Sequence, residues 1–224
     1  MKTPAKMLVS GVLGLISFGV MVFWPAGTFH YWQAWVFLAV FTLATWIPSI
    51  YLLRTNPAAL ERRMRAGPAA EARMVQRIVI AVALVSLVAM IVFSALDYGF
   101  RWSSVPATVS VIGDVLVAIG LAVAMLVVIQ NSYAAANVTV ETGQKLVSTG
   151  LYGLVRHPMY TGNVILMVGI PLALGSYWGL VFVIPGLVVL AIRIRDEEQL
   201  LEHDLAGYRE YAQQVHYRLM PYVW

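Results

Sequence analysis

The chain has 224 residues, of which 60% are hydrophobic and only 12% are charged, and its mean hydropathy is +0.77. A soluble domain of this length cannot bury so much apolar surface, so the composition excludes an ordinary soluble protein. It predicts an all-α integral membrane protein, because a helix pairs its own backbone groups in lipid. The chain has no cysteine, which excludes disulfides and thiolate metal sites.

Six apolar runs are long enough, or nearly long enough, to cross a hydrocarbon core that takes about 20 helical residues. They cover residues 7–24, 33–53, 78–96, 105–130, 159–174 and 180–194. The last two runs are short, and the turn over residues 175–179 contains two glycines and a serine. This pattern predicts a tight helical hairpin whose two free ends lie on the same side of the membrane.

The basic residues predict the orientation of the chain. With six spans, all but one of the fifteen Lys and Arg residues lie on the side of the two termini, and Arg101 lies opposite. Cytoplasmic loops carry such an excess, so we expect both termini and any site on this side to be cytoplasmic. The basic pI of about 9.4 then reflects topology, and no nucleic-acid partner is needed to explain it.

The first four spans contain few polar signals. The loop over residues 54–77 predicts a surface helix over 58–65, whose basic residues either attract an acidic substrate or simply satisfy the orientation rule. In the fourth span, Gly113, Gly120 and Ala124 would let another helix approach closely. Asp114 lies in the same apolar run, near its outer end, which favours a structural or snorkelling role over a functional one.

No repeat or second domain is visible, so we expect one membrane domain over residues 1–224. Within it, residues 1–130 would form a four-helix scaffold and residues 131–224 would carry the function.

Polar side chains concentrate just before the hairpin. Tyr152, Arg156, His157 and Tyr160 surround Pro158 between two apolar runs. The residue before a proline favours an extended backbone, and proline suits the first position of a helix. We therefore expect a loop that turns into a helix, with His157 at the helix start.

The hairpin should bring this helix start close to the end of the last span. Arg193 and Glu197 are four residues apart and face the same way on a helix. Residues 199–224 are polar and are expected to be helical. Together these segments predict a pocket at the cytoplasmic end, closed by the C-terminal helix.

Common catalytic templates are absent from the sequence. It has no glycine-rich phosphate loop, no His-Glu-x-x-His and no Gly-x-Ser-x-Gly. The other histidines stand alone, so no metal site is predicted. His157, Arg193 and Glu197 form the one convergent set, which either performs chemistry or seals the end of the bundle as a charge network.

Ordered motifs run through the last part of the chain: Gly150-x-Tyr152-x-x-Val155-Arg156-His157-Pro158-x-Tyr160-x-Gly162, then Glu197-Glu198-x-x-Leu201, Tyr208-x-x-Tyr211 and Arg218-Leu219-x-Pro221. Over roughly residues 137–224 this set resembles the isoprenylcysteine carboxyl methyltransferase family. Members of that family are membrane enzymes that use S-adenosylmethionine, and phospholipid N-methyltransferases are related to them.

The resemblance implies a catalytic group made of Arg193, Glu197 and His157, in which Arg193 also contacts the substrate. It implies cofactor contacts at Asn137, Gln144, Lys145, Leu146, Val147, Tyr152, His157, Pro158, Met159, Tyr160 and Glu197. Gln144 stands where many members have histidine.

Methyl transfer suits these residues. The methyl group passes in line from a sulfonium to a nucleophile, so the enzyme mainly supplies alignment and a dry pocket. A carboxylate acceptor is already ionised; Arg193 would orient it, and Glu197 would hold the amino group or ribose of the cofactor. The helix start at Pro158 and Met159 would offer backbone N–H groups to the methionine carboxylate.

The sequence thus predicts an S-adenosylmethionine-dependent methyltransferase that acts on a lipid-like or prenylated acceptor in the membrane, most simply the carboxyl group of a prenylcysteine-type substrate. One alternative is a phospholipid amine N-methyltransferase, in which His157 or Glu197 would remove a proton. A second is an NADPH-dependent enzyme like the sterol reductases, which share a similar Arg-His-Pro pattern. A third is a non-catalytic membrane scaffold. The oligomeric state stays open.

Overall fold

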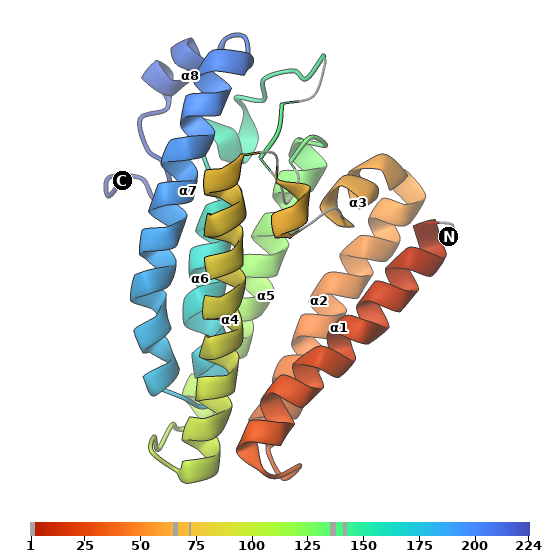
Figure 1. Cartoon of the computed structure of the whole chain (residues 1–224), viewed down its shortest axis with the longest axis vertical. Coiled ribbons are helices and arrows are strands. Elements are labelled where there is room, and N and C mark those ends of the chain that lie inside the picture. Colours follow the sequence, from red (N-terminus) through yellow and green to blue (C-terminus); the bar gives the residue numbers. More distant parts are fainter. Residues whose placement is uncertain (1–2, 65–66, 72, 135–137, 141–142) are drawn as a thin grey trace.

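A computed structural model describes residues 3–64, 67–71, 73–134, 138–140 and 143–224. All regular elements in these residues are helices, which confirms the all-α membrane fold (Figure 1). Five are long and apolar enough to cross a membrane, counting the last together with the short 3-10 helix before it, and one apolar helix is shorter. These six are α1 (Thr3–Ala26), α2 (Trp32–Thr55), α4 (Met74–Phe100), α5 (Ala107–Gln130), α6 (Pro158–Ala173) and α7 (Val183–Asp204).

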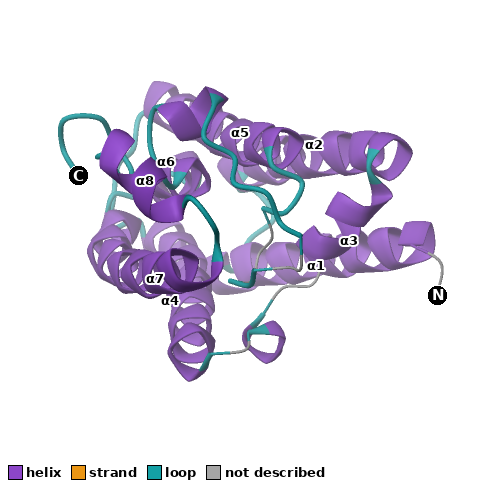
Figure 2. Cartoon of the chain, turned by 90° about the horizontal axis from the view of Figure 1, so that it is seen from above, coloured by secondary structure: helices purple, strands orange, loops and turns teal. Residues whose placement is uncertain are grey.

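Successive long helices run in opposite directions, so the connections alternate between the two ends of the bundle (Figure 1). One end holds both termini and two small helices, α3 (Pro57–Met64) and α8 (Tyr208–Gln214). We call this the basic end, because the sequence places nearly all Lys and Arg residues there. Seen from this end, α3 lies beside α1 and α2, whereas α8 lies over α6 and α7 (Figure 2). That the basic end faces the cytoplasm stays a prediction.

Glycines bring α5 and α6 into close contact. A Cβ on Gly113 would lie 2.2 Å from the Ala173 nitrogen, and one on Gly120 would lie 2.8 Å from the Gly162 oxygen. Backbones this close need small residues on both helices. The prediction that span four receives another helix is therefore confirmed, and that helix is α6.

The predicted hairpin is present, with α6 as its short member. His157 is the N-cap of α6 and Pro158 its first residue, as expected. A 3-10 helix, η3 (Trp178–Phe182), then leads into α7, which continues beyond the apolar run that ends at residue 194 and reaches Asp204. Glu197 and Glu198 therefore lie on the same helix as Arg193, as expected.

The prediction of a helix throughout residues 199–224 is wrong. Gly207 has a φ of 82°, in the left-handed region that ends helices, so α7 and α8 are separate. After Gln214 the chain leaves helical structure and folds back against the start of α6. We call residues 215–224 the C-terminal tail.

Asp114 does not snorkel. It is 5% exposed, and neither carboxylate oxygen has a hydrogen-bond partner among the described residues. Ser110, one turn earlier on the same face of α5, is also buried without a partner for its hydroxyl. The snorkelling expectation was wrong because α5 packs against its neighbours along this face.

Replacing Gly120 with valine should destabilise the bundle, because the added side chain meets the α6 backbone and Leu166. Overpacking of this kind costs about 1–3 kcal/mol, so we expect a clearly lower Tm in thermal unfolding of the detergent-solubilised protein. Gly14→Val in α1 is the matched control, because nothing lies within 4 Å of a Cβ there. Equal Tm values for the two variants would contradict the close contact between α5 and α6.

Candidate functional site

The C-terminal tail fixes the start of α6. The Arg156 and His157 amides donate hydrogen bonds of 2.9 Å to the Tyr217 and Arg218 carbonyl oxygens. One turn into α6, the Thr161 hydroxyl donates to the Leu219 carbonyl oxygen at 2.7 Å. The orientation of His157 is therefore set by a segment about sixty residues away in the sequence.

Glu198 joins these segments to α7. Its Oε1 accepts from Arg156 Nε at 2.8 Å and lies 3.2 Å from His157 Nε2, and its Oε2 accepts from Arg218 Nε at 2.9 Å. Glu198 is 7% exposed. A carboxylate this buried is stable only when cations and donors surround it, so these contacts depend on one another.

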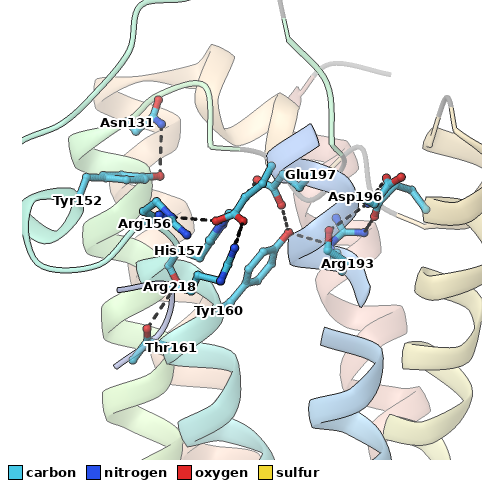
Figure 3. Close-up of polar contacts among 12 residues, drawn as sticks. Asn131, Tyr152, Arg156, His157, Tyr160, Thr161, Arg193, Asp196, Glu197 and Arg218 are labelled. Atoms are coloured by element: carbon cyan, nitrogen blue, oxygen red, sulfur yellow. Dashed lines mark hydrogen bonds and ion pairs between the residues drawn. The ribbon is translucent and has the colours of Figure 1, made fainter. Parts of the chain in front are cut away.

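Tyr160 links Glu197 to Arg193 (Figure 3). Its hydroxyl donates to Glu197 Oε2 and accepts from Arg193 Nε at 2.8 Å. The His157 ring stacks on the Tyr160 ring, and His157 Nδ1 lies 4.0 Å from Glu197 Oε1. The structure thus brings together His157, Glu197 and Arg193, the three residues of the predicted catalytic group, with Tyr160 between the last two.

Arg193 is held by residues just before α4 and in its first turn. Its Nη1 contacts Glu71 Oε1 at 3.1 Å and donates to Gln76 Oε1 at 2.8 Å. Glu71 Oε2 in turn accepts from the Val138 amide at 3.0 Å. One turn along α7 from Arg193, Asp196 pairs with Gln76 and with Arg73.

The sequence did not indicate that Glu71 and Gln76 hold Arg193. It also did not indicate that Glu198 joins three segments of the site. Glu71 is only 2% exposed although it lies in a basic loop, and the available signal was that the loop contains only two acidic residues, Glu61 and Glu71. For Glu198, the signal was the adjacent pair Glu197-Glu198. Neighbours on a helix point about 100° apart, so only one of the pair could face the pocket.

A polar pocket opens at the basic end beside Glu197, with a volume of about 110 Å³. All predicted cofactor contacts in the described residues line it, namely Gln144, Lys145, Leu146, Val147, Tyr152, His157, Pro158, Met159, Tyr160 and Glu197. Asn137 lies outside the described residues. Tyr208 and Tyr211 of α8 also line the pocket, so the predicted closure by a C-terminal helix agrees with the structure.

Three tyrosines keep neutral side chains in this pocket. Burial raises the pKa of Tyr152, Tyr208 and Tyr211, and nearby charges add to the effect, those of Glu197 for Tyr152 and Glu198 for Tyr208 and Tyr211. A neutral phenol offers a hydroxyl donor and an aromatic face that attracts cations. The Tyr208 hydroxyl is buried and has no partner among the described residues, so it is available to a ligand.

The start of α6 offers fewer donors than expected. Proline has no N–H, so Pro158 cannot contribute one. The Tyr160 and Thr161 amides donate to the His157 carbonyl oxygen. Among the described residues, this leaves Met159 with the one unpaired amide of the first turn, and the expectation for Pro158 was wrong.

An apolar cavity of about 430 Å³ adjoins the polar pocket. It lies mainly among α4, α5, α6 and α7, and Arg193 lines this cavity and not the polar pocket. Ala134, Met159 and Tyr160 line both spaces. The site can therefore bring a water-soluble molecule from the basic end next to a molecule that lies within the membrane.

Comparisons with known proteins cover the same region. The phospholipid methyltransferase family matches residues 108–206, which span nearly all of α5 and continue through α7. Among curated proteins, the Delta(14)-sterol reductase TM7SF2 of Mus musculus is 35% identical over 86 residues, which are 37% of this chain. The matched region is 21% of that reductase, so the chain spans about a fifth of the relative's length.

Glu198 and Glu197 should differ sharply in their effect on stability. Glu198→Gln removes the charge that pairs with two arginines and His157, and breaking a buried ion pair costs about 3–5 kcal/mol. Glu197→Gln keeps an oxygen to accept from Tyr160 and should cost far less. Thermal unfolding of both variants measures the difference; similar losses would contradict the central structural role of Glu198.

Glu71→Gln should destabilise the protein by about 1–3 kcal/mol, because it leaves the buried Arg193 without its carboxylate. Glu61→Gln on α3 is the control, since Glu61 is exposed and accepts only from Thr3 among the described residues. A Tm that falls equally in both variants would mean that Glu71 contributes only surface charge.

Proposed function

We propose that this protein is an S-adenosylmethionine-dependent methyltransferase that acts on a lipid-like acceptor embedded in the membrane. The observation that carries the proposal is the pair of adjoining spaces, one polar and one apolar, that meet at Tyr160. The match to the phospholipid methyltransferase family supports it. Neither the two adjoining spaces nor the family match identifies the acceptor.

The polar pocket suits the cofactor chemically. S-adenosylmethionine carries a sulfonium whose methyl group is transferred, together with an amino group, a carboxylate and hydroxyls. Glu197 would accept from the amino group or the ribose. The Tyr208 hydroxyl and the Met159 amide, which have no partner among the described residues, are donors for its acceptors. Faces of neutral tyrosines would stabilise the positive charge.

The polar pocket must widen when such a cofactor binds. Ligand sites usually measure about 300–1,000 Å³, whereas this one measures about 110 Å³. Its wall includes residues 144–147 and Val138, whose amide is bound to Glu71. We propose that this wall moves outward during binding and that the Glu71 contact limits the movement.

The apolar cavity suits one lipid tail. It extends along α6 from Met159 to Ile170, eleven residues that rise about 1.5 Å each, which gives a depth of about 16 Å. Along α4 it extends from Val79 to Met90, which is the same distance. An acceptor whose tail fills this depth would hold its polar end near Tyr160.

We further propose that the acceptor is a carboxylate of the prenylcysteine type, a proposal supported by the motif resemblance. A carboxylate is ionised at neutral pH, so the residues need only align it and exclude water. Arg193 already binds the carboxylate of Glu71. Direct contact between Arg193 and the acceptor therefore requires that the acceptor carboxylate displace that of Glu71. In the present arrangement, Arg193 orients the Tyr160 hydroxyl.

Methylation of a phospholipid amine is the second candidate, and the family match favours it. An ammonium must lose a proton before it can attack, so this reaction needs a base. If His157 is a neutral imidazole whose Nε2 donates to Glu198, its Nδ1 is the unprotonated nitrogen and lies near Glu197. The product distinguishes a carboxylate acceptor from an amine acceptor, since a methyl ester releases methanol in mild base and an N-methyl product does not.

The similarity to a sterol reductase favours a third candidate, a reductase that binds NADPH. A rise in Tm with NADPH, and none with S-adenosylmethionine, would support it. If neither cofactor changes the Tm, the protein is better described as a membrane scaffold.

Cofactor binding tests the leading proposal. We expect calorimetry to show saturable binding of S-adenosylmethionine to the wild-type protein, and Glu197→Gln to weaken it by about tenfold or more, because a charge-assisted hydrogen bond is lost. Lys6→Gln is the control for a change of charge outside the pocket, and it should bind as the wild type does. No heat from the wild-type protein with millimolar cofactor would refute the proposal.

A further inference from the structure

The short helix α3 lies beside the junction of the two spaces. Its buried Leu60 belongs to a cluster with Met125 and Val128 of α5, and Met159 of α6 packs against the same cluster. On the next residues of α3, Arg62 donates to the Ser132 carbonyl oxygen at 3.3 Å and lies over the Tyr133 ring. The helix is thus held against the segment that follows α5.

Arg63, the next residue of α3, lines the apolar cavity. It is half-buried, and among the described residues none accepts a hydrogen bond from its guanidinium or forms an ion pair with it. Burial alone lowers its pKa, with no contribution from a nearby carboxylate. By contrast, Arg73, Arg156 and Arg218 at the same end all have carboxylate partners.

In the described lining of the cavity, Arg63 is also the charged residue that has no partner of opposite charge. The other charged residue in its described lining is Arg193, which Glu71 neutralises. The remaining lining is apolar except for neutral groups such as Ser86 and Asn163. As far as its described lining shows, the cavity is therefore an apolar space with one unpaired cation, Arg63, at the end where a lipid head group would lie.

An unpaired guanidinium against an apolar cavity is unfavourable, and an anion would relieve it. Guanidinium groups bind carboxylates and phosphates through two parallel hydrogen bonds. An amphiphile whose tail fills the cavity brings its head group to the basic end, where α3 lies. Tail and head would thus be recognised by different parts of one site.

We propose that Arg63 binds the anionic head group of the membrane-embedded acceptor, whose tail occupies the apolar cavity. This inference rests on the proposed function and adds a residue that recognises the substrate. The head group is a carboxylate or a phosphate next to the polar end of the tail. A thioether acid and a phospholipid share this chemistry, and the experiment below separates them.

The test compares Arg63→Gln with Arg54→Gln, which removes the same charge from an exposed position at the end of α2. The full chain is purified in a non-ionic maltoside detergent, and probe binding is followed by tryptophan fluorescence. The probes are a fifteen-carbon prenyl thioether acid with its methyl ester, and tetradecyl phosphate with tetradecanol. Each pair shares a tail and differs in charge.

We expect Arg63→Gln to weaken binding of an anionic probe by about tenfold or more and to leave the neutral partner unchanged. A loss for the acid alone means that Arg63 binds the carboxylate of a thioether acid, and a loss for the phosphate alone means that it binds the phosphate of a phospholipid. A loss for both means that Arg63 binds both kinds of anion. Arg54→Gln should change none of the affinities.

Equal losses in the two variants, losses for the neutral probes as well, or no loss at all would overturn the proposal. The wild-type protein gives a test that does not depend on the folding of a variant, because it should prefer at least one anionic probe to its neutral partner by about tenfold. Equal wild-type affinities for acid and ester, and for phosphate and alcohol, would likewise overturn it.

Cofactor affinity, measured by calorimetry in the same preparations, separates this inference from the proposed function. Arg63 does not line the polar pocket, so wild type and Arg63→Gln should bind S-adenosylmethionine equally. If neither binds it while the loss of anionic probe persists, the methyltransferase proposal fails and the anion site stands. If both bind it and the probe affinities are unchanged, only the Arg63 proposal fails.

Discussion

The buried carboxylate of Glu198 is the interaction on which the rest of the site depends. It holds Arg156 and His157 at the start of α6 and Arg218 in the C-terminal tail, all from one turn of α7. Without this carboxylate, Arg156 and Arg218 would lose the ion pairs that hold them at this end of the bundle. Because Glu198 takes this role, its neighbour Glu197 faces the polar pocket and stays available to a ligand.

Tyr160 occupies the boundary between the two spaces. Its ring and hydroxyl lie where the polar pocket meets the apolar cavity, and Glu197 and Arg193 fix the hydroxyl from either side. Arg193 is itself fixed by Glu71 and Gln76, which precede and begin α4. The N-terminal half of the chain therefore helps to build the site, although the sequence motifs lie in the C-terminal half.

Local patterns made much of this fold predictable. Apolar runs gave the spans, the glycines of α5 indicated a close contact with another helix, and Pro158 marked the start of α6. These signals act within a few turns of helix. The apolar run of α7 ends at residue 194, but the helix continues to Asp204, and its polar last turns leave the apolar part of the bundle.

The long-range pairs could not be predicted in this way. Glu71 and Arg193 are 122 residues apart, and nothing in the basic loop indicates which of its side chains would be buried. The path of the C-terminal tail depends on its contacts with Arg156 and Thr161, which helical periodicity does not reveal. The partner of a buried charge is set by packing between helices, so it became visible only in the structure.

The most direct measurement is transfer of a radiolabelled methyl group from S-adenosylmethionine by the purified protein to a total membrane lipid extract. We expect label in an apolar product with the wild-type protein and almost none with Glu197→Gln. Wild-type protein that binds the cofactor but leaves the lipid extract unlabelled would contradict the methyltransferase proposal.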